Sequence, residues 1–142
     1  MKTLSFEEVK QVLDIVENSS LVHQQWYDEL VRILLCRLPI QHKYIGTKSH
    51  QSCEFGRWLY SDNSKHLRKL PAFVKMEQLH TKMHESAREM CMKLQATGLV
   101  QEQDYDYFMR NVTFFREDLK EFKFRVLSTL AHVEKQQSTT SG

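Results

Sequence analysis

The amino-acid sequence predicts an all-α domain that is like a four-helix bundle, with three long helices and one short extra helix. Only four glycines and two prolines occur in 142 residues, which disfavours a turn-rich β architecture and favours long helices. Apolar residues also recur in steps of three and four along three stretches, as in amphipathic helices. The length is that of one domain with its own core.

The first long helix is expected to begin after Ser5. Ser5 and the residue three positions on, Glu8, have the pattern of a capping box, in which each side chain binds a free backbone N–H of the other. Pro39 is expected to mark the end of the helix or a sharp change of its direction, and the polar stretch 18–20 is a weak point within it. The stripe on its inner face comprises Val9, Val12, Val16, Ser19, His23, Trp26, Leu30, Ile33 or Leu34, and Arg37.

The middle of the chain is expected to hold a loop and then the short helix. Residues 40–52 are polar and lack any period, which predicts a loop. Residues 53–60 suffice for two helical turns, with Phe55, Trp58 and Leu59 facing inward. Gly56 is expected to let this short helix approach a neighbour closely.

Two further long helices complete the prediction. Pro71 suits the first turn of a helix and Gly98 its C-terminal end. Asp104 is expected to cap the last helix. We expect residues 1–135 to form the folded domain and the polar residues 136–142 a disordered tail. The two inner stripes comprise Phe73, Met76, His80, Met83, Ala87, Met90 or Cys91 and Leu94, and then Tyr105, Phe108, Val112, Phe115, Leu119, Phe122, Val126, Leu130 and Val133.

The last helix is apolar around more than one face. Tyr107, Phe114 and Phe124 lie off its main stripe. A four-helix packing does not need this extra apolar surface, so a symmetric homodimer that buries it is the simplest expectation.

Composition and charge exclude several classes of function. Twenty Lys and Arg against 18 Asp and Glu leave a net charge of +2, and acids and bases alternate along the chain, so nucleic acid is not an expected partner. No apolar run is long enough to span a membrane, and the start has acidic residues where a signal peptide would be apolar. We therefore expect a cytoplasmic protein whose three cysteines are free thiols or metal ligands.

Three histidines and one cysteine have the residue types and spacing to surround one metal ion. His80 and His84 are four residues apart on a helical stretch and so project from the same face. His23 falls on the apolar stripe of the first helix, and Cys53 begins the short helix. Three imidazoles and one thiolate are a donor set that suits tetrahedral Zn²⁺.

Each of these four residues taken singly has an ordinary explanation. A histidine on a core stripe is more often buried and hydrogen-bonded than a ligand, and Cys53 could be a small buried side chain. Together they favour a metal, because two separate helices place imidazoles where apolar residues are expected. Burying such a group unpaired costs about 1–3 kcal/mol, and one shared ion removes the penalty for both helices.

Other chemistries fit the sequence less well. The pair His80 and His84 has the spacing of zinc proteases but lacks the glutamate that acts as general base, and four protein ligands leave no open position. A di-iron bundle needs two Glu-x-x-His units, and only residues 77–80 match. No phosphate-binding loop or nucleophile elbow is present, so an enzyme is not expected. His50 could compete for the ion, whereas Cys36 and Cys91 are expected to be small buried residues.

The chain resembles the chemoreceptor zinc-binding (CZB) domain family. The resemblance rests on three phrases: His23-Gln24-Gln25-Trp26, Cys53-Glu54-Phe55-Gly56-Arg57-Trp58 and His80-Thr81-Lys82-Met83-His84-Glu85-Ser86-Ala87. The cysteine phrase is most similar to the variant at the N-terminus of zinc-regulated diguanylate cyclases. The resemblance implies a helical, dimeric domain that holds Zn²⁺ through His23, Cys53, His80 and His84.

The resemblance also implies a regulatory role in bacterial signal transduction. The output would be of the diguanylate cyclase or chemoreceptor type. No such domain follows in the sequence, so the output is expected in cis in a longer parent protein or in trans on a partner. Two alternatives stay open: a passive, zinc-stapled dimerisation module and an iron-binding helical bundle.

Cys53 is expected to be the responsive ligand. Its place at the start of a helix and beside Zn²⁺ predicts a lowered thiol pKa. Loss of the ion, or oxidation of the sulfur to a sulfenic acid, is expected to release the short helix and loosen the dimer.

Overall fold

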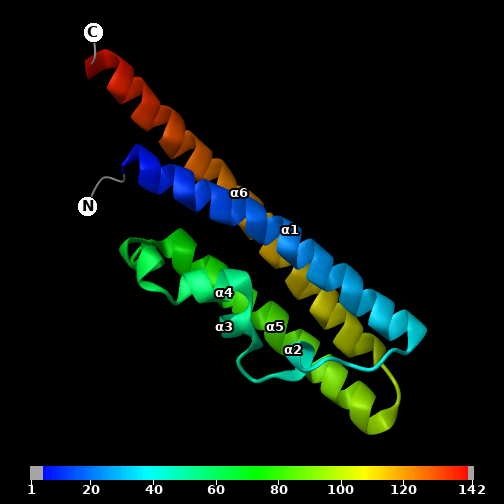
Figure 1. The fold of residues 1–142 in the computed structure, drawn as a ribbon. Helices are drawn as coiled ribbons and strands as arrows, with labels where there is room; N and C mark the ends of the chain where they lie inside the picture. Colours follow the sequence, from blue (N-terminus) through cyan, green and yellow to red (C-terminus); the bar gives the residue numbers. More distant parts are fainter. Residues whose placement is uncertain (1–4, 141–142) are drawn as a thin grey trace.

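Three long helices and a set of short helical segments form an antiparallel bundle. The computed structural model describes the backbone of residues 5–140 and the side chains of residues 5–129. The long helices are α1 (Phe6–Cys36), α5 (Pro71–Thr97) and α6 (Glu102–Thr140). In Figure 1, α1 and α5 run in the same direction and α6 runs back beside both. No strand occurs in the part of the chain that the structure describes, so the predicted all-α class is confirmed.

Helix α1 begins as the sequence predicts. The Ser5 hydroxyl accepts a hydrogen bond from the Glu8 backbone N–H (3.2 Å), and the Glu8 side chain accepts one from the Ser5 N–H (3.3 Å). The predicted weak point at residues 18–20 does not interrupt the helix. Arg37, in the left-handed conformation with φ 53°, ends it two residues before Pro39.

The loop predicted over residues 40–52 is partly wrong, because two short helices lie within it: α2 (His42–Ile45) and α3 (Ser49–Ser52). Neither has a side-chain cap, and four residues are too few to show a helical period. Contacts with α5 hold this segment instead. Tyr44 is buried, and the Arg88 guanidinium donates a hydrogen bond to the Ile45 carbonyl (3.0 Å).

The short segments occupy the fourth corner of the bundle. Helix α4 (Glu54–Leu59) packs against α1, and the 3₁₀ helix η1 (Asp62–Leu67) connects it to α5. Phe55 and Leu59 are buried and Trp58 is half-buried, which confirms the predicted inward side of α4. The chain therefore runs back alongside α5, through α2, α3 and α4, before it enters that helix (Figure 1).

Helices α5 and α6 differ little from the prediction. Pro71 is in the first turn of α5, and Gly98 ends the helix in the left-handed conformation with φ 75°. Helix α6 begins at Glu102, so Asp104 lies inside its first turn and the predicted cap is wrong. Its backbone is helical to Thr140 and so includes most of the predicted tail, whereas residues 141–142 lie outside the described residues. The domain division at residue 135 stays a prediction.

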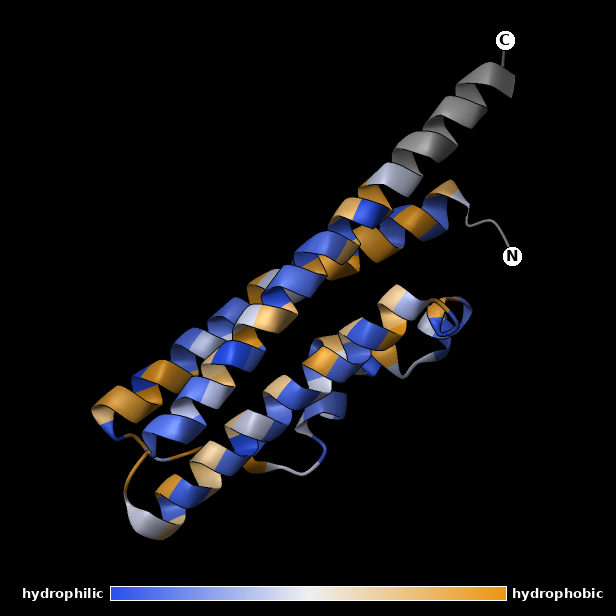
Figure 2. Cartoon of the chain, turned by 180° about the vertical axis from the view of Figure 1, so that it is seen from behind, coloured by the Kyte–Doolittle hydropathy of each residue, from blue (hydrophilic) through white to orange (hydrophobic). Residues whose placement is uncertain are grey.

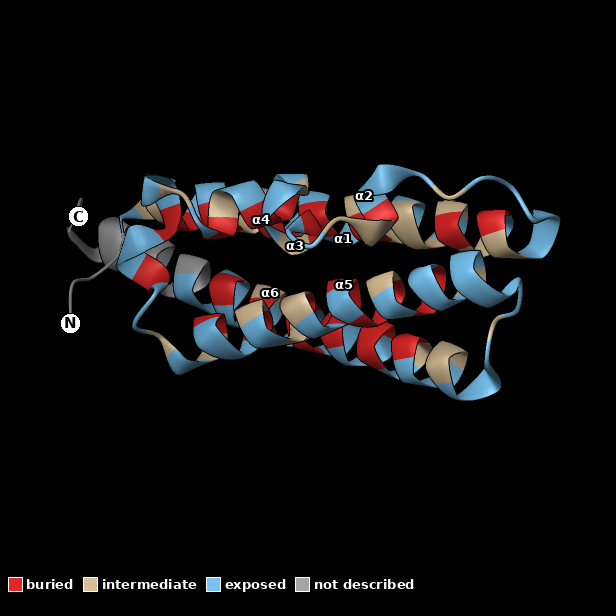
Figure 3. Cartoon of the chain, turned by 90° about the horizontal axis from the view of Figure 1, so that it is seen from below, coloured by how far each residue is buried: buried red, intermediate tan, exposed pale blue. Residues whose placement is uncertain are grey.

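The core lies between the helices, along the predicted stripes, except that Arg37 is exposed at the end of α1. Leu130 and Val133 of the last stripe lie outside the residues whose side chains the structure describes. Buried residues are on the sides of the helices that face one another, and exposed residues are on the outside (Figure 3). Apolar and polar residues accordingly alternate around the long helices (Figure 2). Tyr107, Phe114 and Phe124 are 46%, 46% and 70% exposed, as expected for residues off the stripe. Among the described residues, no helix has the length and apolar content to cross a membrane.

Candidate metal centre

Helix α1 holds His23 with one ring nitrogen toward the bundle interior. His23 is 8% exposed, and its Nδ1 lies 2.9 Å from the Ser19 carbonyl and 3.2 Å from the Ser19 hydroxyl. A carbonyl can only accept, so Nδ1 carries the hydrogen of that bond. The lone pair of the neutral ring is then on Nε2, which faces His80.

Helix α5 supplies two imidazoles from one face. His80 and His84 are 0% and 2% exposed, and their ring centroids are 4.6 Å apart, as the spacing of four residues predicts. Among the described residues, no hydrogen-bond partner is present for His80 Nδ1 or for either ring nitrogen of His84. Such buried groups without a partner call for an explanation, and a metal ion would supply a partner for one ring nitrogen of His84.

Cys53 reaches the same place from the junction of α3 and α4. It is the C-cap of α3 and the N-cap of α4, with an extended backbone. Its sulfur accepts a hydrogen bond from the Gly56 backbone N–H (3.2 Å). The short helix therefore presents the thiol at its N-terminal end, where the backbone dipoles favour a negative charge.

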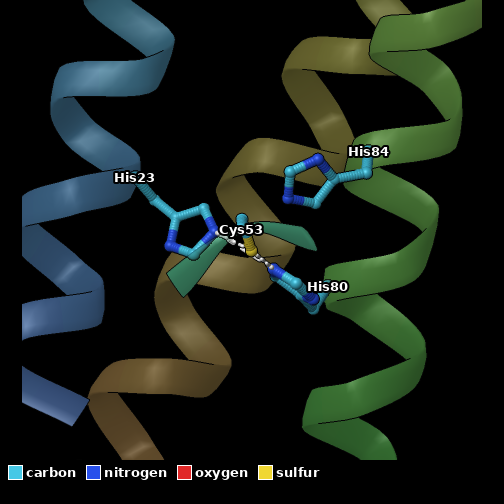
Figure 4. A group of neighbouring side chains, drawn as sticks. All are labelled: His23, Cys53, His80 and His84. Carbon is cyan, nitrogen blue, oxygen red and sulfur yellow. Dashed lines mark hydrogen bonds between the residues drawn. The ribbon is translucent and has the colours of Figure 1, made fainter. Parts of the chain in front are cut away.

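The four side chains meet at one point. One ligand atom from each of His23, Cys53, His80 and His84 lies within 4.8 Å of the other three. His80 Nε2 is 3.1 Å from His23 Nε2 and 3.3 Å from Cys53 Sγ, and Cys53 Sγ is 3.9 Å from His23 Nε2. Figure 4 shows side chains from three separate elements pointing toward one another.

These separations fit a tetrahedral ion. With Zn–N bonds of about 2.0–2.1 Å and a Zn–S bond of about 2.3 Å, neighbouring ligand atoms lie about 3.3 Å (N to N) and about 3.6 Å (N to S) apart. The three separations given above, 3.1 Å, 3.3 Å and 3.9 Å, lie on both sides of these values. The donor set therefore fits Zn²⁺, and His84, which lies within 4.8 Å of the other three ligand atoms, would complete the shell by moving toward them.

Burial keeps the three imidazoles neutral, which is the form that binds metal. Desolvation lowers the pKa of His23 from 6.5 to about 4, although the bond to Ser19 opposes the shift. Desolvation, assisted by the charges of His23 and His50, lowers the pKa of His84 to about 3. The pKa of His80 is lowered well below 6.5 for the same reasons.

The predicted thiol pKa is wrong for the protein without a bound cation. Burial raises the pKa of Cys53, and the backbone N–H groups of Gly56 and Phe55 and the charge of Arg57 offset only part of the effect. The sequence indicated that Cys53 begins a helix, but not how deeply the thiol is buried. Burial has the larger effect on the thiol pKa. A cation beside the sulfur is what would favour the thiolate.

Aromatic rings enclose the site. The centroid of Phe115 lies 5.1 Å from that of His23 and 5.2 Å from that of His80, and Phe55 lies 5.1 Å from His80. Trp26 lies 4.9 Å from His84. The sequence placed these residues on inner faces but gave no sign that they surround the histidines. It also missed Ser19 as the partner of His23.

The remaining candidates lie elsewhere. His50 is half-buried and is outside the group of four, although its charge acts on His80 and His84. Cys91 is buried as predicted. Cys36 is exposed, so the prediction that it is buried is wrong; it is the last residue of α1 and faces outward there.

Comparison with known proteins agrees with the geometry. Residues 23–91 match the family described as the chemoreceptor zinc-binding domain, a range that extends from His23 past His84. The zinc-binding character of this family fits the His and Cys group found in the structure.

The chain is also similar to a curated protein and to a solved structure. The chain is 21% identical over 127 residues to the diguanylate cyclase DgcZ of Escherichia coli (strain K12), covering 89% of this chain and 43% of that protein. The chain thus spans less than half of the curated relative's length. The structure of the regulatory CZB domain of DgcZ matches with a TM-score of 0.70 and 22% identity, covering 84% of this chain and 98% of that domain.

The solved relative supports the fold, and its matched part is a regulatory domain rather than a catalytic one. The family match covers the three phrases that carry the resemblance in the sequence. Over residues 23–91 the chain is therefore similar to the chemoreceptor zinc-binding domain family.

Proposed function

We propose that this protein is a zinc-binding regulatory domain of bacterial signal transduction, with His23, Cys53, His80 and His84 as the ligands. The observation that carries the proposal is the convergence of three imidazoles and one thiol, from three separate elements, within 4.8 Å. When bound, Zn²⁺ supplies a positive charge that links these elements. The ligands close a tetrahedral shell, which is typical of a binding site rather than a catalytic one.

Zinc titration of ligand variants tests the ligand assignment. The parent protein and Cys53→Ala compete with a chromophoric chelator, and Cys36→Ala is the matched control because Cys36 is an exposed thiol at the end of α1. We expect Cys53→Ala to keep the fold and bind zinc much more weakly, with Cys36→Ala unchanged. Parental affinity in Cys53→Ala would contradict the proposal.

We further propose that the output is a diguanylate cyclase or a chemoreceptor-type protein, in cis or in trans. The similarity to DgcZ, of which this chain matches 43%, supports the first of these. The test is to fuse the chain to the catalytic part of a diguanylate cyclase and to measure its activity with and without zinc. If the fusion binds zinc and its cyclase activity does not change, the proposed cyclase output is contradicted.

The signal is proposed to act through α4. Cys53 is the only one of the four ligands outside the long helices, so loss of its bond frees the short helix while three donors remain. Oxidation of the sulfur to a sulfenic acid is expected to weaken zinc binding without emptying the site. Zinc affinity measured before and after peroxide treatment tests this, with Cys53→Ala as the variant that should not respond.

A homodimer is part of the proposal. The exposed aromatics of α6 give it an apolar surface that the single chain leaves uncovered. Sedimentation velocity at micromolar concentration is the test, with Phe124→Lys as the variant expected to dissociate. A clean zinc-bound monomer would contradict the dimer.

The alternative of a passive zinc-stapled module is favoured by the burial of the three histidines, which slows exchange of an ion. Transfer of zinc to a chelator separates the two functions, since a sensor must release the ion at concentrations that a cell reaches. Metal analysis of protein purified without added metal tests the iron-binding alternative.

A further inference from the structure

Gly56 lies where a side chain has no room. A Cβ built at this position would be 1.9 Å from the His50 carbonyl oxygen, 2.8 Å from its carbon and 3.0 Å from Gln51 Cα. All three are backbone atoms, so no side-chain rotation can relieve the contact. Only glycine lets α4 lie this close to α3.

The same residue contacts the sulfur of Cys53. The Gly56 N–H donates a hydrogen bond to Cys53 Sγ, with the two atoms 3.2 Å apart. Cys53 is at the junction of the two short helices whose packing depends on Gly56. The spacing of α3 and α4 and the position of the sulfur are therefore set by one residue.

We propose that Gly56 is the positioning residue of the candidate metal centre: by packing α4 on the His50 carbonyl and donating its N–H to Cys53, it fixes where the sulfur lies. This inference rests on the proposed function, because it assumes that Cys53 is a ligand. It goes beyond the ligand set by naming the residue that makes the fourth ligand available.

The first test uses the unaltered protein loaded with ¹¹³Cd²⁺ in place of zinc. If the Gly56 N–H binds a metal-bound sulfur, a proton–cadmium correlation is expected between the Gly56 amide hydrogen and the ion, transmitted through the sulfur. A Cys53 β-proton correlation without a Gly56 correlation would overturn the inference. Absence of both would overturn the ligand assignment as well.

The second test is Gly56→Ala, with Gly46→Ala as the matched control. Gly46 lies in the same segment, and a Cβ there would meet its nearest atom, His42 Nε2, at 3.4 Å, which is an ordinary contact. Loss of partners that hold metal ligands lowers affinity about 10- to 100-fold, so we expect that fall for Gly56→Ala and none for Gly46→Ala. With Co²⁺ bound, the sulfur-to-metal charge-transfer band should also weaken in Gly56→Ala alone.

A double-mutant cycle shows whether Gly56 acts through the sulfur. In a Cys53→Ala background, Gly56→Ala should no longer change zinc affinity. An equal fall in both backgrounds, or parental affinity for Gly56→Ala alone, would overturn the inference and leave the proposed function standing. Parental affinity for Cys53→Ala would overturn both. If Gly56→Ala does not fold, the cadmium correlation decides.

Discussion

The histidines and the cysteine of the candidate metal centre are held by two different kinds of structure. The three imidazoles project from α1 and α5, helices of 31 and 27 residues whose inner faces are packed into the core. The thiol projects from the junction of α3 and α4, which have four and six residues. Helices this short are not stable alone.

The difference indicates which part of the site can respond. Because packing of the long helices preorganises the three nitrogens, we expect them to keep their places with or without an ion. On the thiol side, α4 is anchored by the buried Phe55 and Leu59. Few side-chain hydrogen bonds add to this: the Gly56 N–H to the sulfur, the bond from Asn18 to Glu54 (3.1 Å) and the bond from Tyr60 to Glu77 (3.0 Å). The four predictions below test this contrast between a fixed histidine side and a movable thiol side.

Acidification should act on the histidine side alone and give the largest effect. The folded-state pKa of His23 and His84 is about 4 and about 3, against 6.5 without the fold, so the unfolded chain binds more protons as pH falls. Their contribution is complete above about pH 6.5 and is lost as pH falls through that value toward 4. The Cys53 thiol, with a raised pKa, does not titrate in this range.

We therefore expect the metal-free protein to lose about 4 kcal/mol of unfolding free energy between pH 7 and pH 5, about 2 from each of His23 and His84. The lowered pKa of His80 acts in the same direction. Urea unfolding with chelator at both pH values measures the loss. Equal stability at the two values would show that the imidazoles are not buried as neutral groups.

Zinc should act mainly on the thiol side. At a free zinc concentration about 100 times Kd, binding stabilises the folded state by about 2.7 kcal/mol. Hydrogen exchange should show the gain in protection concentrated in α3 and α4, because α1, α5 and α6 are already packed. If zinc increased protection only in the long helices, the histidine side rather than the thiol side would be the part that moves.

Replacing a histidine should stabilise the metal-free protein while destroying the site. Neither ring nitrogen of His84 has a partner among the described residues, so burying this imidazole costs about 1–3 kcal/mol that no hydrogen bond offsets. His84→Leu removes this cost. Cys53→Ala should change metal-free stability little. Thermal unfolding in chelator and zinc titration measure both; a strongly destabilised His84→Leu would indicate a purely structural histidine.

The smallest effect is expected at the far end of α4. Tyr60→Phe removes the exposed hydrogen bond to Glu77 and should reduce stability by about 0.5 kcal/mol, with a slight fall in zinc affinity. Tyr107→Phe on α6 is the matched control. A large fall in affinity for Tyr60→Phe would mean that this bond, rather than Gly56, holds α4.

The long helices could be predicted from the sequence because their signals are local. The capping box at Ser5, Pro71 in a first turn and Gly98 at an end each satisfy or remove backbone groups of the adjacent turn. The start of α6 was misplaced because Asp104 is equally favourable inside a first turn. Helices α2 and α3 were missed because contacts with α5, not local signals, hold them.

The site followed from the sequence in its residue types but not in its environment. The spacing of His80 and His84 and the odd positions of His23 and Cys53 were readable, and the structure brings all four together. The rise in the pKa of the Cys53 thiol could not be predicted from the sequence, because it depends on residues that cover Cys53 from other elements. The exposure of Cys36 likewise depends on which face of α1 lacks a neighbour.

X-ray absorption of the zinc-loaded protein tests the central claim most directly, since it counts the atoms around the ion. The account predicts one sulfur at about 2.3 Å and three imidazole nitrogens at about 2.0–2.1 Å. A zinc shell without sulfur, or one dominated by oxygen, would contradict it.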